Sequence, residues 1–157
     1  MSFKDDWKFG MQGEKKFFKY LTDKLKISDI ERGSQYCFYD FISESKKLVI
    51  ELKTRRRNYR SIRRTNIPYS KLRNFRKFNA RKNYKYLFIM VFQFYDGIYF
   101  FEHKEGYNYT VEKFCRKKRI DYDDKPEDYI WIQKKDLEPI CNIRRYTDSK
   151  MIVRYNV

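Results

Sequence analysis

Two short apolar runs separated by a polar stretch form the clearest pattern along this chain. They cover residues 36–42 and 48–53, and β-branched and aromatic side chains dominate both. This composition predicts two buried strands, and the polar residues 43–47 between them predict a tight hairpin. A turn centred between positions 45 and 46 places Asp40 directly opposite Glu51.

Three charged residues interrupt these apolar runs. Side chains alternate along a strand, so Lys53 lies on the face of Glu51, while Leu52 points the other way with its carbonyl near the same edge. Directly opposed residues have Cβ atoms about 4.5–5.5 Å apart, so Asp40 and Glu51 can share one divalent cation, also bound by the Leu52 carbonyl. Unpaired charges inside apolar strands are costly, which favours a site. The alternative is that Glu51 and Lys53 decorate a solvated sheet face.

A helical pattern near the start of the chain adds a fourth charge. At a period of 3.6 residues, Glu14 lies within an apolar stripe, whose members are Trp7, Phe17, Phe18, Leu21 and Leu25. Gly10, one turn earlier on the same side, permits close approach of a sheet or a phosphate. The alternative for Glu14 is a surface glutamate favoured by the helix dipole.

These residues, taken in order, resemble the PD-(D/E)xK nuclease superfamily. The motif is Gly10-x-x-x-Glu14 on a helix, then Asp40, then Glu51-Leu52-Lys53 on the next strand, with Tyr39 in the position of the motif's proline. The superfamily includes archaeal-type Holliday junction resolvases, restriction endonucleases and many viral nucleases. The resemblance covers roughly residues 10–140 and implies an α/β class with a restriction-endonuclease-like mixed central sheet flanked by helices. The length allows one such domain over residues 1–157.

The resemblance also implies a role for each site residue. Asp40 and Glu51 hold Mg²⁺ or Mn²⁺, Lys53 positions or helps to deprotonate the attacking water, and Glu14 completes the metal site. A hard cation held by carboxylates neutralises phosphate oxygens and makes water nucleophilic. Whether Glu14 recruits a second ion stays open. The single histidine, His103, argues against a histidine-based metal site.

Charge points to a polyanionic partner. The chain of 157 residues has 37 Lys and Arg against 21 Asp and Glu, a formal charge of +16. Residues 54–95 contain thirteen basic residues and no acidic one. The candidate nucleic-acid-binding residues in this run are Arg55, Arg56, Arg57, Arg60, Arg63, Arg64, Lys71 and Arg73. A solvated basic face is the alternative. Interleaved aromatic residues could stack on bases or serve as core anchors.

The rest of the pattern predicts a sheet between helices. We expect a helix over 70–79 capped by Ser70, strands over 84–94, 98–103 and 129–133, and a short helix over 111–118. The acidic cluster within 121–128 predicts a solvated loop, with masking of the basic surface as the alternative.

Three cysteines without metal-ligand spacing predict reduced thiols in a cytosolic protein, and no apolar run predicts a membrane span.

The sequence therefore predicts a metal-dependent DNA endonuclease. Resemblance to junction resolvases makes branched DNA the first expectation for the substrate and a homodimer the matching assembly, although no sequence feature proves a dimer. An RNA-cleaving or exonucleolytic enzyme of the same fold is an alternative, because the metal site treats all phosphodiesters alike. A non-catalytic DNA-binding protein would need the basic run but not the four charged positions.

Overall fold

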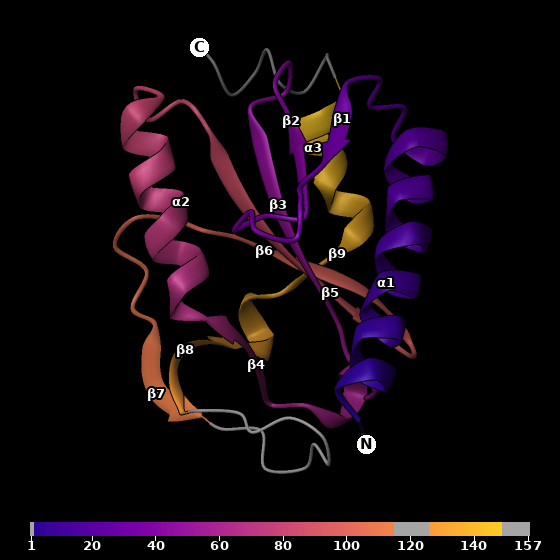
Figure 1. Cartoon of the computed structure of the whole chain (residues 1–157), viewed down its shortest axis with the longest axis vertical. Coiled ribbons are helices and arrows are strands. Elements are labelled where there is room, and N and C mark those ends of the chain that lie inside the picture. Colours follow the sequence, from indigo (N-terminus) through magenta and orange to yellow (C-terminus); the bar gives the residue numbers. More distant parts are fainter. Residues whose placement is uncertain (1, 115–125, 149–157) are drawn as a thin grey trace.

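The computed structural model describes residues 2–114 and 126–148, which form a mixed α/β fold (Figure 1). Its α-helices are α1 (Phe3–Lys19), α2 (Tyr69–Arg81) and α3 (Arg144–Thr147), and α1 continues into one turn of π-helix. The helices α1 and α2 stand on opposite sides of the larger sheet. The predicted class, a mixed sheet flanked by helices, is confirmed.

The larger sheet has six strands in the order β1-β2-β3-β5-β6-β9. Its central pair, β3 and β5, is parallel, and all other neighbours are antiparallel. A crossover through α2 joins this parallel pair, as parallel strands require. The strand bounds are β1 (Ile30–Arg32), β2 (Phe41–Ser43), β3 (Leu48–Thr54), β5 (Leu87–Phe94), β6 (Gly97–Glu102) and β9 (Glu138–Pro139).

A second sheet, not foreseen from the sequence, has three antiparallel strands in the order β4-β8-β7. They are β4 (Arg64–Pro68), β8 (Glu127–Gln133) and β7 (Thr110–Phe114). The prediction of a helix over 111–118 is wrong for residues 111–114, because pairing with β8 overrides the local pattern. Residues 115–118 and most of the acidic cluster lie outside the described residues. Its last two members, Glu127 and Asp128, belong to β8 rather than to a loop.

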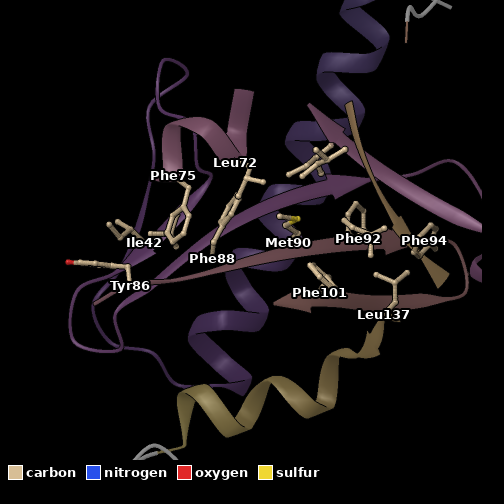
Figure 2. Packing of buried hydrophobic residues seen from close by; sticks show 14 of the residues in the cluster. Ile42, Leu72, Phe75, Tyr86, Phe88, Met90, Phe92, Phe94, Phe101 and Leu137 are labelled. Carbon is tan, nitrogen blue, oxygen red and sulfur yellow. The ribbon is translucent and has the colours of Figure 1, made fainter. Parts of the chain in front are cut away.

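The hydrophobic core lies on both faces of the larger sheet, and β5 contributes to both. Phe88 and Met90 face α2 and the smaller sheet, where Phe88 stacks on Phe75 with 4.8 Å between ring centroids (Figure 2). Ile89 and Val91 face α1 and α3. Both faces of β5 are therefore apolar, as suits a strand in the centre of a covered sheet.

The strand β3 shows the alternation on which the site depends. Leu48, Ile50 and Leu52 belong to the core under α1, whereas Val49 belongs to the core under α2. Glu51 and Lys53 continue the Val49 face, so the expectation that they share a face is confirmed.

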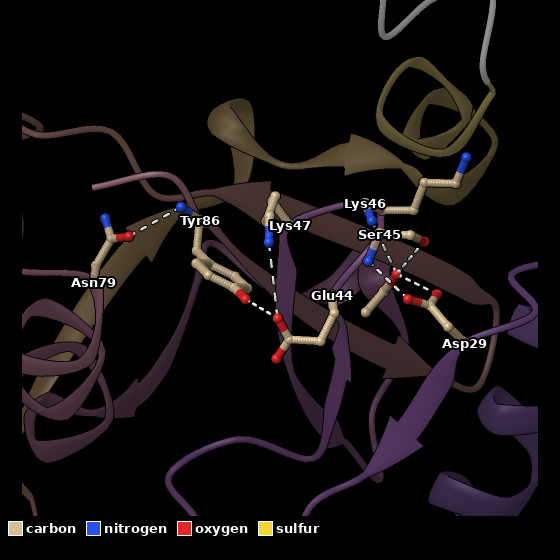
Figure 3. Close-up of polar contacts among 8 residues, drawn as sticks. Asp29, Glu44, Ser45, Lys46, Lys47, Asn79 and Tyr86 are labelled. Atoms are coloured by element: carbon tan, nitrogen blue, oxygen red, sulfur yellow. Dashed lines mark hydrogen bonds and ion pairs between the residues drawn. The ribbon is translucent and has the colours of Figure 1, made fainter. Parts of the chain in front are cut away.

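The turn between β2 and β3 is fixed by side chains on both sides (Figure 3). The Asp29 carboxylate accepts hydrogen bonds from the Ser43 hydroxyl and the Ser45 N–H, each at 2.7 Å. On the other side, the Tyr86 hydroxyl donates to the Glu44 carboxylate. This turn sets a register in which Phe41 pairs with Ile50, which is the predicted register.

Two predictions need correction: one concerns the segment before this turn, and the other the start of the helix after β4. Only the end of the predicted strand 36–42 is a strand, because residues 34–40 turn and Gly33 donates to the Asp40 carbonyl at 2.8 Å. Asp40 thus directly precedes β2. The helix α2 begins after Pro68 and is not capped by the Ser70 side chain.

The apolar stripe of α1 is only partly as predicted. Phe17 and Leu21 are fully buried, but Trp7 is 57% exposed and does not join them. Gly10 faces open space, so it does not bring the helix close to the sheet. That role belongs to Gly13, where an added Cβ would lie 2.0 Å from Thr54 Oγ1 and 3.0 Å from Thr54 Cβ.

We expect Gly13→Ala to lower the free energy of unfolding by about 1–3 kcal/mol, because α1 must move away from β3. Gly10→Ala is the matched control and should raise it by about 0.5–1 kcal/mol, since alanine is the better helix former and nothing opposes its methyl group. Urea titrations of the two variants measure both effects. Equal stability of the two variants would contradict the close packing of Gly13 on Thr54.

Two further expectations concern the described residues alone. Cys37 and Cys141 are free thiols, whereas Cys115 lies outside them. Within residues 2–114 and 126–148, no helix combines the length and apolar character that crossing a membrane requires.

Candidate active site

The candidate site lies at an open edge of β3. Pairing with β2 ends at Ile50, so β3 has no β2 neighbour beyond that residue. Asp40 occupies this edge: its N–H donates to the Ile50 carbonyl at 2.9 Å, and its Oδ2 accepts from the Leu52 N–H at 2.7 Å. The main chain of β3 therefore positions the Asp40 carboxylate beside Glu51.

Glu51 is a buried carboxylate, 1% exposed, that two lysines approach. The Nζ atoms of Lys53 and Lys71 lie 2.9 and 3.3 Å from the same Glu51 oxygen, Oε1. Neither contact is aligned as a hydrogen bond, and neither Glu51 oxygen accepts one from the described residues. A buried carboxylate normally accepts several hydrogen bonds. The Glu51 oxygens therefore have lone pairs that a bound cation could use.

Asp40 shows the electrostatic cost of placing two carboxylates together. Burial, and then the charge of Glu51, raise the pKa of Asp40 to about 7, although Lys53 and the Leu52 N–H act in the opposite direction. The ionised form of Asp40 is therefore disfavoured in the metal-free protein, chiefly by burial. A bound cation would favour that ionised form.

The donors at this edge fit a hard divalent cation. The Leu52 N–H points to Asp40, and a strand residue directs its N–H and C=O to the same edge, so the Leu52 carbonyl faces this side as well. Two carboxylates and one carbonyl are oxygen ligands that suit Mg²⁺, which keeps several waters. Across the described part of the chain, no three His, Cys, Asp or Glu side chains are grouped closely enough to bind one ion. The candidate ligands are therefore Asp40, Glu51 and Leu52.

Glu14 lies in the same cleft but has a different partner. Its Oε2 is 2.8 Å from Nη2 of Arg32, on β1. Its charge is close enough to contribute to the raised pKa of Asp40. Glu14 stands about three turns from the start of α1, so the helix dipole does not explain its position.

A cleft of about 670 Å³ surrounds the site. Its walls come from α1, from β3 and the segment after it, and from one face of the smaller sheet. Five of the eight basic residues predicted to bind nucleic acid line this cleft, namely Arg55, Arg56, Arg57, Arg64 and Lys71. The other three, Arg60, Arg63 and Arg73, are exposed elsewhere.

The cleft arginines differ in their partners. Arg55 donates to the side chain and the carbonyl of Asn66, on β4. The Arg56 guanidinium lies 2.7 Å from the Asp6 carboxylate and stacks on Phe9, 4.1 Å from the ring centroid. Several of the cleft arginines are thus held in place by the fold.

Two features of the cleft were not predicted from the sequence. Lys71 was expected only as a phosphate contact, yet it reaches Glu51 from the first turn of α2. Trp131, on β8, lines the cleft with Arg64 stacked over its ring at 3.8 Å. The alternation of Trp131 with two buried isoleucines could have predicted its place in the cleft. No local pattern could have predicted the contact of Lys71 with Glu51.

The single histidine takes no part in this site. His103 is buried outside the cleft, with Nδ1 2.6 Å from the Tyr109 hydroxyl and Nε2 3.0 Å from Glu105. Burial lowers the pKa of His103. A histidine general base at the cleft is therefore excluded.

The pKa of Asp40 predicts how pH affects metal binding. Because this pKa is raised in the folded protein, Asp40 favours folding most at low pH, and the metal-free protein loses that contribution as pH rises from about 4 to about 7. A bound cation and the proton compete for the Asp40 carboxylate. We expect the apparent Mg²⁺ affinity to fall by up to about tenfold per pH unit below pH 7.

Calorimetry in two buffers of different ionisation enthalpy would count the released proton. Near pH 6.5, Mg²⁺ binding should release a fraction of a proton from the unaltered chain, and Asp40→Asn should abolish that release. An affinity that stays constant between pH 5 and pH 8 would contradict the assignment of Asp40 as a ligand.

Neither protein-family models nor curated protein sequences give a match to this chain.

Proposed function

We propose that this protein is a metal-dependent DNA endonuclease with a restriction-endonuclease-like core. The observation that carries the proposal is Glu51, a buried carboxylate that accepts no hydrogen bond from residues 2–114 and 126–148, set beside Asp40 and approached by Lys53. These groups lie in a basic cleft at an open strand edge. The same residues carry the resemblance to the PD-(D/E)xK superfamily.

The chain's own residues divide the work of phosphodiester hydrolysis. Asp40, Glu51 and the Leu52 carbonyl would hold Mg²⁺ or Mn²⁺, which neutralises phosphate oxygens and lowers the pKa of a bound water. Lys53 places a positive charge beside Glu51, where it can orient the water and stabilise the developing negative charge. Glu14, paired with Arg32, contributes negative charge from across the cleft.

The basic walls of the cleft support a nucleic-acid substrate. Arg57 is exposed and lines the cleft next to β3, so phosphates bound there would lie close to the carboxylates. Each neutralised phosphate should add about 0.9 to the salt slope on duplex DNA. The resemblance to junction resolvases favours branched DNA as the substrate. It also favours a homodimer that presents two active sites.

A non-catalytic DNA-binding protein is the competing function. It would use the arginines, but it would give no reason to bury Glu51 and Asp40 together at an energetic cost. RNA cleavage and exonuclease activity remain alternatives within the same chemistry.

A cleavage panel tests the proposal. The purified protein is incubated with Mg²⁺ and closed circular duplex, closed circular single-stranded, flapped and four-way-junction DNA, with RNA alongside. Cleavage of a closed circle, abolished by EDTA, would support an endonuclease. Cleavage of linear DNA alone would indicate an exonuclease. Binding without cleavage in Mg²⁺ or Mn²⁺ would favour the non-catalytic alternative.

A further inference from the structure

One face of the smaller sheet carries a cluster of aromatic rings toward the cleft. Phe114 makes edge contacts with Tyr129 and Trp131, with ring centroids 5.3 and 6.2 Å apart. All three residues line the same cleft as Asp40 and Glu51. The opposite face of this sheet is different, since Ile130 and Ile132 there are buried in the core. We call Phe114, Tyr129 and Trp131 the aromatic wall.

A planar cation completes the aromatic wall. The Arg64 guanidinium stacks on Trp131 at 3.8 Å and is fixed by Glu112, to which its two terminal nitrogens donate at 3.2 and 3.0 Å. Because this pairing already neutralises Arg64, its flat face matters more here than its charge. Aromatic rings and guanidinium planes are the two surfaces on which nucleic-acid bases stack.

The aromatic wall is not simply a part of the core. Phe114 is 40% exposed and Trp131 is half-buried, whereas Tyr129 is buried and contacts Phe114. Arg55 and Lys71 line the same cleft. A basic groove with exposed rings beside it matches a strand whose phosphates and bases are both accessible. In duplex DNA the bases are stacked on one another, so their faces cannot reach such a wall.

The size of the cleft supports the same ligand. Its volume of about 670 Å³ lies within the range of small-ligand pockets, about 300–1,000 Å³. Such a volume suits one or a few nucleotides entering the cleft.

We propose that the aromatic wall binds the bases of unpaired nucleotides and selects single-stranded DNA, or the single-stranded part of a branched substrate, for the adjacent site. The inference deepens the proposed nuclease function and rests on it for its biological meaning. The binding itself requires no cleavage, so it can be tested separately.

The chain offers a direct optical probe of the wall. It contains two tryptophans, and Trp7 is exposed and does not line the cleft. In a Trp7→Phe background, tryptophan fluorescence reports on Trp131 alone. In EDTA, we expect a short oligothymidylate to quench this fluorescence, whereas an abasic oligomer of equal length and a blunt duplex should not. Equal quenching by the abasic oligomer would overturn the proposal, because phosphate binding alone would then explain it.

Variants on β7 provide a matched pair. Phe114→Ser removes a ring from the wall, and Val111→Ser removes an exposed apolar side chain from the other face of the same strand. We expect Phe114→Ser to weaken oligothymidylate binding about tenfold, without changing the affinity for the abasic oligomer, and Val111→Ser to leave both affinities unchanged. Equal effects of the two variants would contradict the aromatic wall.

The outcomes separate this inference from the proposed function. Base-dependent quenching without cleavage of any substrate would retain the wall and remove the nuclease. Cleavage of closed circular duplex at the same rate as single-stranded DNA, without base-dependent quenching, would retain the nuclease and remove the wall. Because these measurements need only Trp7→Phe and two exposed β7 positions, they do not depend on whether a Trp131 variant folds.

Discussion

Glu51→Gln should lower the rate of cleavage by roughly 10³-fold or more, because the metal-bound state supplies several kcal/mol of transition-state stabilisation. The buried Glu51 oxygens accept no hydrogen bond from the described residues, so the substitution breaks none there. A neutral amide attracts a hard cation far less strongly than a carboxylate does. DNA binding in EDTA or Ca²⁺ should remain, since the cleft loses one negative charge and no basic residue.

Asp40→Asn should lower the rate of cleavage to the same extent, and it should stabilise the metal-free protein. The amide oxygen can still accept the Leu52 N–H, and the charge that burial and Glu51 disfavour is gone. Above pH 7 and without metal, the free energy of unfolding should rise by on the order of 2 kcal/mol. Single-turnover cleavage and thermal unfolding, measured together, show both effects.

Asp23→Asn, at an exposed carboxylate outside the cleft, is the control for both variants. It should retain full cleavage and unchanged stability. Full activity in both Asp40→Asn and Glu51→Gln would remove the metal site, and with it the proposed function.

The sequence predicted the geometry of this site where local rules suffice. Strand alternation placed Glu51 and Lys53 on one face, and the turn composition predicted the pairing of Phe41 with Ile50. Both inferences need only residues close in sequence. They brought the two carboxylates together without knowledge of the rest of the fold.

Contacts between distant elements could not be predicted in this way. Lys71 reaches Glu51 only because α2 packs beside β3, and Glu14 meets Arg32 only because β1 lies next to the cleft. The helical period favoured Trp7 as a core residue, yet Trp7 is 57% exposed. In α1 the sequence pointed to Gly10, whereas the approach to β3 occurs at Gly13.

The two lysines at Glu51 should differ in their effect on catalysis. Lys53 follows Glu51 by two residues on the same strand face, so its ammonium stays beside the carboxylates whatever binds. Both side chains are 24% exposed, but Lys71 comes from a separate helix, so it can turn from Glu51 to a phosphate once a cation binds the Glu51 oxygens. Lys53→Ala should therefore reduce the cleavage rate, and Lys71→Ala should also weaken substrate binding.

We expect Lys53→Ala to lower the single-turnover rate by about 10²–10³-fold with little change in affinity. Lys71→Ala should lower the rate less, weaken DNA binding, and reduce the salt slope by about one unit. Lys77→Ala, at an exposed position on the same helix outside the cleft, is the control and should leave the rate unchanged. Rates across a salt series, and dissociation constants measured in Ca²⁺ across the same series, measure these differences.

If Lys53→Ala changes only affinity, the catalytic role assigned to Lys53 is wrong. An unchanged salt slope in Lys71→Ala would instead leave Lys71 as a structural partner of Glu51, because a lysine that meets phosphate must release a counterion when DNA binds.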